Sequence, residues 1–275
     1  MLTITPIGSC RIATPLRLGR QELGYAINGG RLYGYSHSAS EAVQQMRFLK
    51  GEYTPSTEVW PLIAPGTPLA VKNAETHEES DIYVVEVSSA KTFALGGEFV
   101  QLNYLRRHFA DFFADVPRTL AYMRLCRARD RVAMRDFLGD VWGATARQRK
   151  EAAVLERIEL QFCDTEMLER DLAQLKDGLG RLLIVSHVDA KLPNGQSLNG
   201  RDVFIRQVCE AARRLDLPLC DPTQAMRRMG QGRAIADESS GLAHYTDEFA
   251  RALVHDWFCD WFRPMTQDAM LHDPA

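Results

Sequence analysis

The run Asp81-Ile-Tyr-Val-Val-Glu-Val-Ser-Ser89 constrains the fold more than any other stretch of the chain. Its side chains are almost continuously apolar and β-branched, which is typical of a parallel strand that is buried on both faces. Such a strand needs helices packed above and below it. The run ends in Ser88-Ser89-Ala90-Lys91, a cluster of small residues that predicts a turn.

Three other short runs are interpreted as strands of the same sheet, with amphipathic helices between them. These runs are residues 2–7, 181–186 and 217–220. Residues 198–215 and 246–262 are expected to be two of the helices. Strands that alternate with helices form parallel sheets. We therefore predict an α/β fold, three-layer and flavodoxin-like, with a central parallel sheet in a single domain over residues 1–275.

Residues 100–180 are interpreted as a helical insertion in this fold. Apolar side chains recur there at helical spacing, as at Leu102 and Leu105 near the start and at Ile158 and Leu160 further on. The segment is longer than one crossover between parallel strands requires. We expect it to pack beside the sheet and to help close the site.

Three local features complete the fold prediction. Residues 51–79 contain prolines at positions 55, 61, 65 and 68, which predicts a long loop, with a short strand around Leu69–Val71. Ser38 is expected to cap a helix that ends at Leu49. The last dozen residues are expected to be frayed.

Composition excludes several classes of function. The net charge of −3 gives no basic signal for nucleic acid, and no apolar run is long enough to span a membrane. The six cysteines lack CxxC spacing, which argues against a metal site and a disulfide framework and favours reduced thiols. The N-terminus has no signal-peptide pattern, so we expect a cytoplasmic protein. No cofactor is expected.

The opening stretch holds the first candidate for chemistry. The alternation of Leu2, Ile4 and Ile7 runs into Gly8-Ser9-Cys10, which predicts a strand and a tight turn. Ser9 would then lie at the carboxyl end of the strand, where open α/β sheets bind ligands. Two interpretations stay open: Ser9 is a nucleophile served by a base, or it only caps the next segment.

Other polar residues are expected to meet Ser9 at the same edge of the sheet. Ser88 and Ser89 follow one predicted strand, His187 follows another, and His244 precedes the last helix. His244 is positioned to accept the proton of Ser9, and backbone N–H groups after Ser9 are suited to stabilise an oxyanion.

These motifs resemble the SGNH (GDSL-type) hydrolase superfamily, and Gly8-Ser9-Cys10 is most similar to its GSCFA-type branch. The resemblance implies that Ser9 is the nucleophile. It also implies that His244, in His-Tyr-Thr-Asp-Glu-Phe-Ala, is the base. Asn28-Gly29-Gly30 is similar to the family's second block, which helps form the oxyanion hole. Ser88-Ser89 occupies the place of its third block.

The chain departs from the family pattern at three places. Arg11-Ile12 replaces the Phe-Ala of the GSCFA motif, and Gly241 stands where the family has the aspartate of Asp-x-x-His. Asp237 is then the first choice to hold the imidazole of His244, unless the site is a Ser-His dyad. The third block has no asparagine, and Asn28 is one replacement for it.

Four further residues carry two interpretations each. His187 and His37 are either substrate contacts or ordinary loop histidines. Cys10 is either a second nucleophile or a small buried filler. Arg11 either binds an anionic group or is solvated.

The sequence favours a serine-dependent esterase or O-acyltransferase that acts on an acylated small molecule or saccharide. Its partners would be a small-molecule or saccharide ester substrate and, for transfer, an acyl donor, without nucleic acid or membrane. The alternative is a catalytically weak or inactive module of the same fold that binds a saccharide, a nucleotide or a coenzyme A group.

Overall fold

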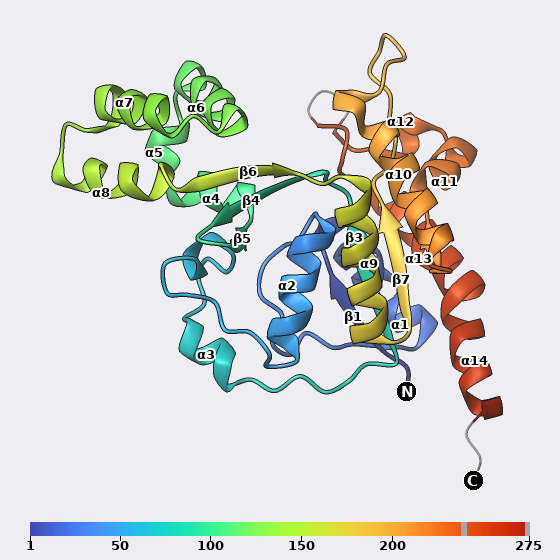
Figure 1. Ribbon diagram of the computed structural model, residues 1–275. Helices are drawn as coiled ribbons and strands as arrows, with labels where there is room; N and C mark the ends of the chain where they lie inside the picture. The colour runs from blue at the N-terminus through green and yellow to red at the C-terminus, as the bar shows by residue number, and fades with distance from the viewer. Residues whose placement is uncertain (238–240, 273–275) are drawn as a thin grey trace.

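A computed structural model describes residues 1–237 and 241–272, and its centre is a five-stranded sheet (Figure 1). Its strands, in the spatial order β2-β1-β3-β7-β8, are β2 (Ala26–Ile27), β1 (Thr3–Ile7), β3 (Ile82–Val87), β7 (Leu182–Ser186) and β8 (Leu219–Cys220). All neighbouring pairs are parallel. The predicted α/β fold with a central parallel sheet is confirmed.

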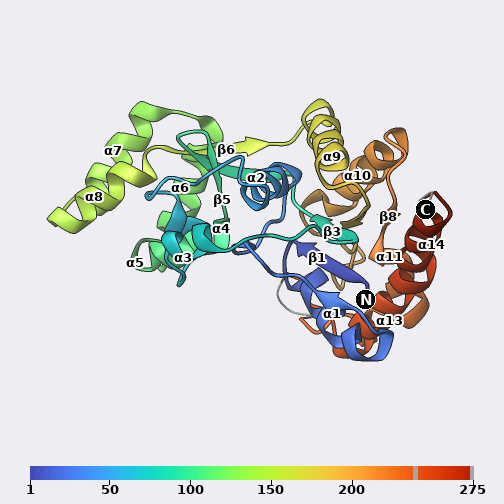
Figure 2. The ribbon, with the colours of Figure 1, turned by 90° about the horizontal axis from the view of Figure 1, so that it is seen from below.

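Helices cover both faces of this sheet, as Figure 2 shows. On one face, sharing one hydrophobic core, lie α1 (Cys10–Leu23), α11 (Pro222–Met229), α12 (Gln231–Ala234) and α13 (Asp247–Trp257). On the other lie α2 (Ala39–Leu49), α9 (Thr165–Leu179) and α10 (Arg201–Arg214). Successive side chains of β3 point to opposite faces of the sheet, so one strand contributes to the cores on both faces. Ile82 and Val84 belong to the core under α1 and α13, and Tyr83 and Val85 belong to the core under α2 and α9.

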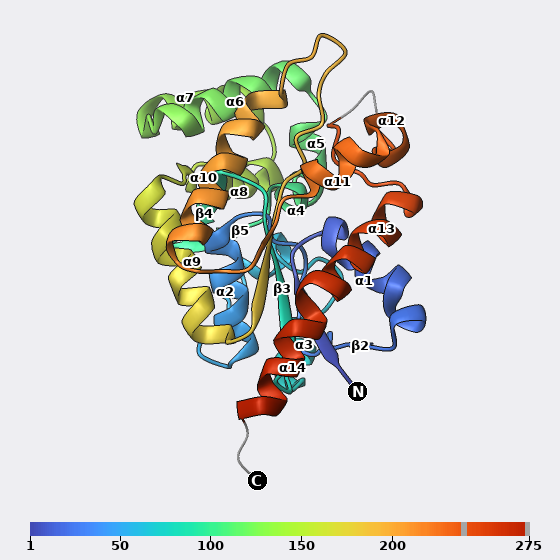
Figure 3. The same ribbon diagram turned by 90° about the vertical axis from the view of Figure 1, so that its right-hand side faces the viewer.

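The first of these faces is closed by the C-terminal helices. Figure 3 shows α13 alongside α1, and α14 (Arg263–His272) continues its path after a π-helical turn at Phe258–Phe262. Phe249 and Trp257 of α13 are fully buried. The expectation of frayed final residues is wrong as far as His272, because the chain remains helical there.

A second, antiparallel sheet corrects the prediction that residues 100–180 are helical throughout. It has the order β5-β4-β6, with β5 (Glu98–Val100), β4 (Lys91–Leu95) and β6 (Ile158–Phe162). Ile158 and Leu160 are buried while Glu159 between them is exposed, so their spacing is that of a strand. Residues two apart lie on the same face of a strand but on different faces of a helix, so this spacing itself favours a strand.

Five helices lie between β5 and β6 and form the end of the molecule that is remote from α13 (Figure 1). They are α4 (Leu102–His108), α5 (Ala110–Phe113), α6 (Val116–Ala128), α7 (Arg131–Trp142) and α8 (Ala146–Leu155). They share a core with the second sheet that includes Phe112, Tyr122 and Leu155.

The loop between β2 and β3 contains further short elements. Ser38 caps α2 as expected, and Glu41 completes a capping box with it. The strand expected around Leu69–Val71 is instead α3 (Leu69–Ala74), a short helix with no buried residue that begins after Pro68. A 3-10 turn at Trp60–Leu62 also lies in this loop, and another at Leu198–Gly200 lies between β7 and β8.

Candidate active site

The turn between β1 and α1 places Ser9 at the carboxyl end of β1. Ser9 is the N-cap of α1, and its Oγ accepts a hydrogen bond from the N–H of Arg11 at 3.3 Å. Gly8 permits this turn, because a Cβ there would lie 2.5 Å from the Cβ of Glu86 and 2.7 Å from Ile12 Cδ1. The backbone of β1 therefore approaches β3 closely just before Ser9.

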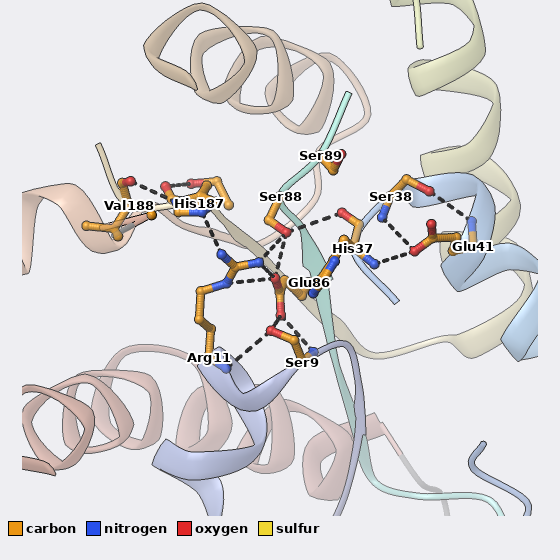
Figure 4. A network of polar contacts seen from close by, with 12 residues as sticks. Ser9, Arg11, His37, Ser38, Glu41, Glu86, Ser88, Ser89, His187 and Val188 are labelled. Carbon is orange, nitrogen blue, oxygen red and sulfur yellow. Dashed lines mark hydrogen bonds and ion pairs between the residues drawn. The ribbon is translucent and has the colours of Figure 1, made fainter. Parts of the chain in front are cut away.

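The carboxylate of Glu86, near the end of β3, is the centre of the site (Figure 4). Glu86 is fully buried, and its Oε2 accepts the N–H of Ser9 at 2.8 Å and the hydroxyl of Ser9 at 2.6 Å. Its Oε1 accepts Arg11 Nε at 2.9 Å, Arg11 Nη2 and the hydroxyl of Ser88 at 2.6 Å. A buried charge needs such a complete set of partners.

The surroundings of Glu86 keep it ionised. Burial alone would raise its pKa, but the charge of Arg11 and the hydrogen bonds from Ser88 and Ser9 lower the pKa to about 2. An ionised carboxylate only accepts hydrogen bonds, so Ser9 must direct its hydroxyl proton at Glu86. With this pKa, Glu86 is too weak a base to remove that proton near neutral pH.

His187, just after β7, supports Arg11 from the other side. Arg11 Nη1 lies 2.5 Å from His187 Nε2, and His187 Nδ1 lies 2.8 Å from the carbonyl oxygen of Val188. Because a guanidinium only donates and a carbonyl only accepts, the proton of His187 lies on Nδ1. Burial lowers the pKa of His187 well below its ordinary value, and the charges of Arg11 and Arg201 lower it further. His187 is therefore a neutral brace for Arg11.

Asp237 and His244 form a second polar group in the segment before α13. Asp237 Oδ1 accepts the N–H groups of Ala243 and His244 at 2.9 and 2.8 Å, and Oδ2 lies 3.0 Å from His244 Nδ1. The His244 side chain is 65% exposed. Burial would raise the pKa of Asp237, but hydrogen bonds from His244 and Ala243 lower it. Asp237 thus holds the imidazole by one nitrogen and leaves Nε2 directed elsewhere.

Arg201 joins the His244 segment to the buried group. It donates to the carbonyl oxygens of Leu242 at 2.8 Å and of Gly241 at 2.7 Å. Burial raises the pKa of Tyr245, the charge of Arg11 lowers it and that of Glu86 raises it. The loop that carries His244 is therefore near Arg11 and Glu86, although Ser9 donates its hydroxyl to Glu86 and not to His244.

The remaining residues proposed from the sequence lie around this centre or apart from it. Cys10 is half-buried in the first turn of α1, next to Ser9. Ser89 bonds locally with Lys91, and its side chain points away from Glu86 in Figure 4. Asn28 is engaged by the carbonyl oxygen of Glu78 and by Ser80, and Gly29 is exposed beside it. Asn28 lies well back along the sheet from the Ser9 turn, because its N–H donates to Ile4.

A cavity of about 300 Å³ lies next to Gly8 on the side of the loop after β2. Tyr35 and Tyr104 are part of its lining, and their rings stack with centroids 5.9 Å apart and an interplanar angle of 21°. Lys72, which pairs with Glu75 at 2.8 Å, lies at its border. The cavity offers an aromatic surface beside the Ser9 turn.

Glu86 is the principal residue that the sequence interpretation missed. It lies within a strand that is otherwise apolar, and a charged residue in a strand buried on both faces requires a charged partner. That requirement was the available signal. Arg201 and Gln101 gave no comparable signal, because their contacts join segments far apart in the chain.

Two classes of structure are not found in the described part of the chain. Residues 1–237 and 241–272 contain no group of three or more His, Cys, Asp or Glu side chains placed to bind a metal ion. Within the same ranges, no helix combines the length and the apolar character needed to cross a membrane.

Comparison with known proteins gives the family. A family model described as the TviD N-terminal domain matches residues 2–260. The chain belongs to this family. The Vi polysaccharide biosynthesis protein TviD of Salmonella typhi is 34% identical over 256 residues, which are 92% of this chain and 31% of that protein. The TviD-like chain thus spans about a third of the length of this curated relative. No solved structure matches this chain.

The ion pair of Glu86 and Arg11 in this TviD-like domain should be essential for stability. Glu86→Gln leaves the Arg11 guanidinium buried without a partner charge, so we expect the free energy of unfolding to fall by about 3–5 kcal/mol in urea titrations at pH 7. As a control, Glu248→Gln removes a surface pair with Arg233, whose side chains are 53% and 67% exposed. That change should alter stability by about 1 kcal/mol or less.

The same pair predicts a pH dependence. The pKa of Glu86 is about 2 in the folded state, against an ordinary value of 4.5. Its contribution to the free energy of unfolding is therefore fully present at a pH above this ordinary value. It is lost as the pH falls from about 4.5 toward 2. The free energy of unfolding of the wild type should therefore decrease over this range more steeply than that of Glu86→Gln. Identical pH profiles for the two proteins would contradict the assignment.

Proposed function

We propose that this chain is an acyltransferase domain that moves an acyl group to or from a saccharide hydroxyl, by a serine mechanism of the SGNH type. The observation that carries the proposal is the Asp237–His244 pair, in a segment whose backbone is held by Arg201, a residue within range of the charge of Arg11. The pair is an oriented imidazole, and the next residue, Tyr245, lies within range of the charges of Arg11 and Glu86 at the carboxyl edge of the parallel sheet. The relative's role in polysaccharide biosynthesis supports a saccharide as substrate.

In the proposed reaction, Ser9 Oγ attacks the carbonyl carbon of the acyl donor while His244 Nε2 takes its proton. The tetrahedral intermediate collapses, and the donor's alcohol or thiol leaves with the proton from His244. A saccharide hydroxyl then attacks the acylated Ser9, and its proton passes through His244 back to Ser9 Oγ. With water in place of the saccharide, the same steps are hydrolysis. Asp237 stabilises the imidazolium that forms twice in the cycle.

The contacts of Ser9 set a condition for this mechanism. Its hydroxyl is bonded to Glu86, which does not take the proton, and the residue is only 3% exposed. The Ser9 side chain must therefore rotate from Glu86 toward His244 when the donor binds. The backbone N–H of Ser9, which also donates to Glu86, keeps the turn fixed during this rotation.

The same contacts favour a second candidate function. A serine that is buried and fully engaged by Glu86 suits a binding module, in which Arg11, Glu86 and Ser9 are structural. In that case the site takes a saccharide, a nucleotide or a coenzyme A group without covalent chemistry. Covalent labelling distinguishes the two functions.

We expect a fluorophosphonate probe to label Ser9, as identified by peptide mass mapping. Ser9→Ala and His244→Ala should each reduce p-nitrophenyl acetate turnover by on the order of 10³-fold or more, and the double variant should lose little more. Asp237→Asn should lose less than His244→Ala. His108→Ala, an exposed histidine on α4, is the control that should keep full turnover.

Three results would contradict the serine mechanism. Retention of turnover in Ser9→Ala would exclude Ser9 as the nucleophile. Acetylation that maps to Cys10 after treatment with p-nitrophenyl acetate, and that disappears in Cys10→Ala, would assign the nucleophile to the neighbouring thiol. Absence of any covalent adduct would favour the binding module.

The cavity beside Gly8 is proposed as the place of the saccharide. Tyr35 is 43% exposed, and its ring stacks on Tyr104, so it offers a fixed apolar face to a pyranose ring. The N–H of Tyr35 donates to the Tyr104 hydroxyl at 3.0 Å, which fixes the pair. Gly34 allows this packing, since a Cβ there would lie 2.1 Å from the Ile63 carbonyl oxygen.

Tyr35→Ala should weaken the binding of the saccharide acceptor without slowing the acylation of Ser9. With base-treated Vi polysaccharide as acceptor, we expect its KM to rise roughly tenfold, about 1.4 kcal/mol, while p-nitrophenyl acetate turnover stays unchanged. Phe162→Ala removes an aromatic ring of similar exposure, 44%, on β6 and is the matched control. Equal KM values for Tyr35→Ala and Phe162→Ala would exclude the cavity as the acceptor site.

A further inference from the structure

His37 is fixed between the two turns that form the site. Its carbonyl oxygen accepts the N–H groups of Ser88 and Ser89 at 2.7 and 2.9 Å, and its own N–H donates to Glu41 at 2.6 Å. The N–H of the preceding residue, Ser36, donates to the carbonyl oxygen of Gly8 at 3.4 Å. The backbone of His37 is thus tied to the ends of both β1 and β3.

Gln101 determines which nitrogen of His37 carries the proton. Gln101 Oε1 caps α4 by accepting the N–H groups of Asn103 at 2.6 Å and Tyr104 at 3.0 Å. This fixes the orientation of the amide, so Gln101 Nε2 is the atom that faces His37 Nδ1 at 3.1 Å. An amide nitrogen only donates, so His37 Nδ1 is the acceptor and neutral His37 carries its proton on Nε2.

The imidazole of His37 is neutral and directed at the reacting group. Burial lowers its pKa, the charge of Glu86 raises it and the charge of Arg11 lowers it, so the ring lies within range of both charges. Figure 4 shows the ring extending from its backbone toward Glu86 and Ser9. His37 is only partly buried, and within the described part of the chain its ring forms a hydrogen bond at Nδ1 alone, which leaves Nε2–H for a bound molecule.

We propose that His37 Nε2–H donates a hydrogen bond to the oxyanion that forms when Ser9 attacks an acyl carbonyl, and that Gln101 is the positioning residue that fixes this tautomer. The inference rests on the proposed acyl transfer at Ser9. Donors aimed at a developing oxyanion are among the largest contributions to acyl transfer, and a neutral imidazole N–H polarises a carbonyl oxygen. In the SGNH pattern an asparagine helps to form the oxyanion hole. The turn after β3 has no asparagine, and Asn28 is already bonded to Glu78 and Ser80, so His37 takes this role.

The first test is the tautomer itself, which is read without any substrate. In ¹⁵N-labelled wild-type protein, long-range ¹H–¹⁵N correlation at pH 7 should show the His37 proton on Nε2 and an unprotonated Nδ1. Gln101→Leu removes the amide donor, so the proton should no longer be confined to Nε2. A wild-type proton on Nδ1 overturns the proposal, whatever the activity of the protein.

The second test is the acylation rate with p-nitrophenyl acetate. His37→Leu should lower kcat by on the order of 100-fold with little change in KM. His37→Gln, whose amide N–H reaches a similar position, should retain at least ten times the kcat of His37→Leu. Gln101→Leu should lower kcat as well. Gln148→Leu is its matched control, because Gln148 bonds to Thr145 in the capping box of α8, far from His37.

The outcomes separate this proposal from the proposed function. Wild-type kcat in a folded His37→Leu variant, or equal losses in His37→Leu and His37→Gln, overturns the role of His37 while the losses in Ser9→Ala and His244→Ala stand. Equal losses in Gln101→Leu and Gln148→Leu overturn the role of Gln101. Full turnover in Ser9→Ala overturns both the proposed function and this inference.

Discussion

The site depends on one buried ionic interaction, the pair formed by Glu86 and Arg11. A carboxylate in the middle of a parallel sheet is costly unless every lone pair is engaged, and here the partners come from different segments. The Ser9 turn follows β1, Ser88 follows β3, and His187 braces Arg11 from the end of β7. Satisfying Glu86 therefore assembles the carboxyl edge of the sheet, with Ser9 in a single orientation.

Three histidines of the candidate site have different environments and hence different proposed roles. His187 is buried against Arg11, holds its proton on Nδ1 and braces the guanidinium. His37 has the opposite tautomer, because Gln101 donates to its Nδ1. His244 is exposed and oriented by Asp237, as a general base requires. Burial lowers the pKa of both His37 and His187, and the positive charge of Arg11 lowers it further, so both imidazoles are neutral near pH 7.

The sequence predicted the central sheet because its signals are local. Each strand is an apolar run with its own turn, and Ser38 caps α2 through residues only three positions away. The strand β6 was missed, although the two-residue spacing of Ile158 and Leu160 fits a strand, because it follows a long helical segment. Its pairing with β4 also comes from residues far along the chain. The network of Glu86 was missed for the same reason, since Arg11 lies 75 residues away in sequence.

The most direct test of this account is a crystal structure of the protein after reaction with a fluorophosphonate. We predict a covalent bond from phosphorus to Ser9 Oγ and a phosphoryl oxygen within hydrogen-bond reach of His37 Nε2. Glu86 should keep its bonds to Arg11 and to the N–H of Ser9, and Ser9 Oγ should have turned away from Glu86 toward His244. An adduct on Cys10, or an unmodified Ser9 still donating to Glu86 in crystals soaked with excess reagent, would contradict the serine mechanism.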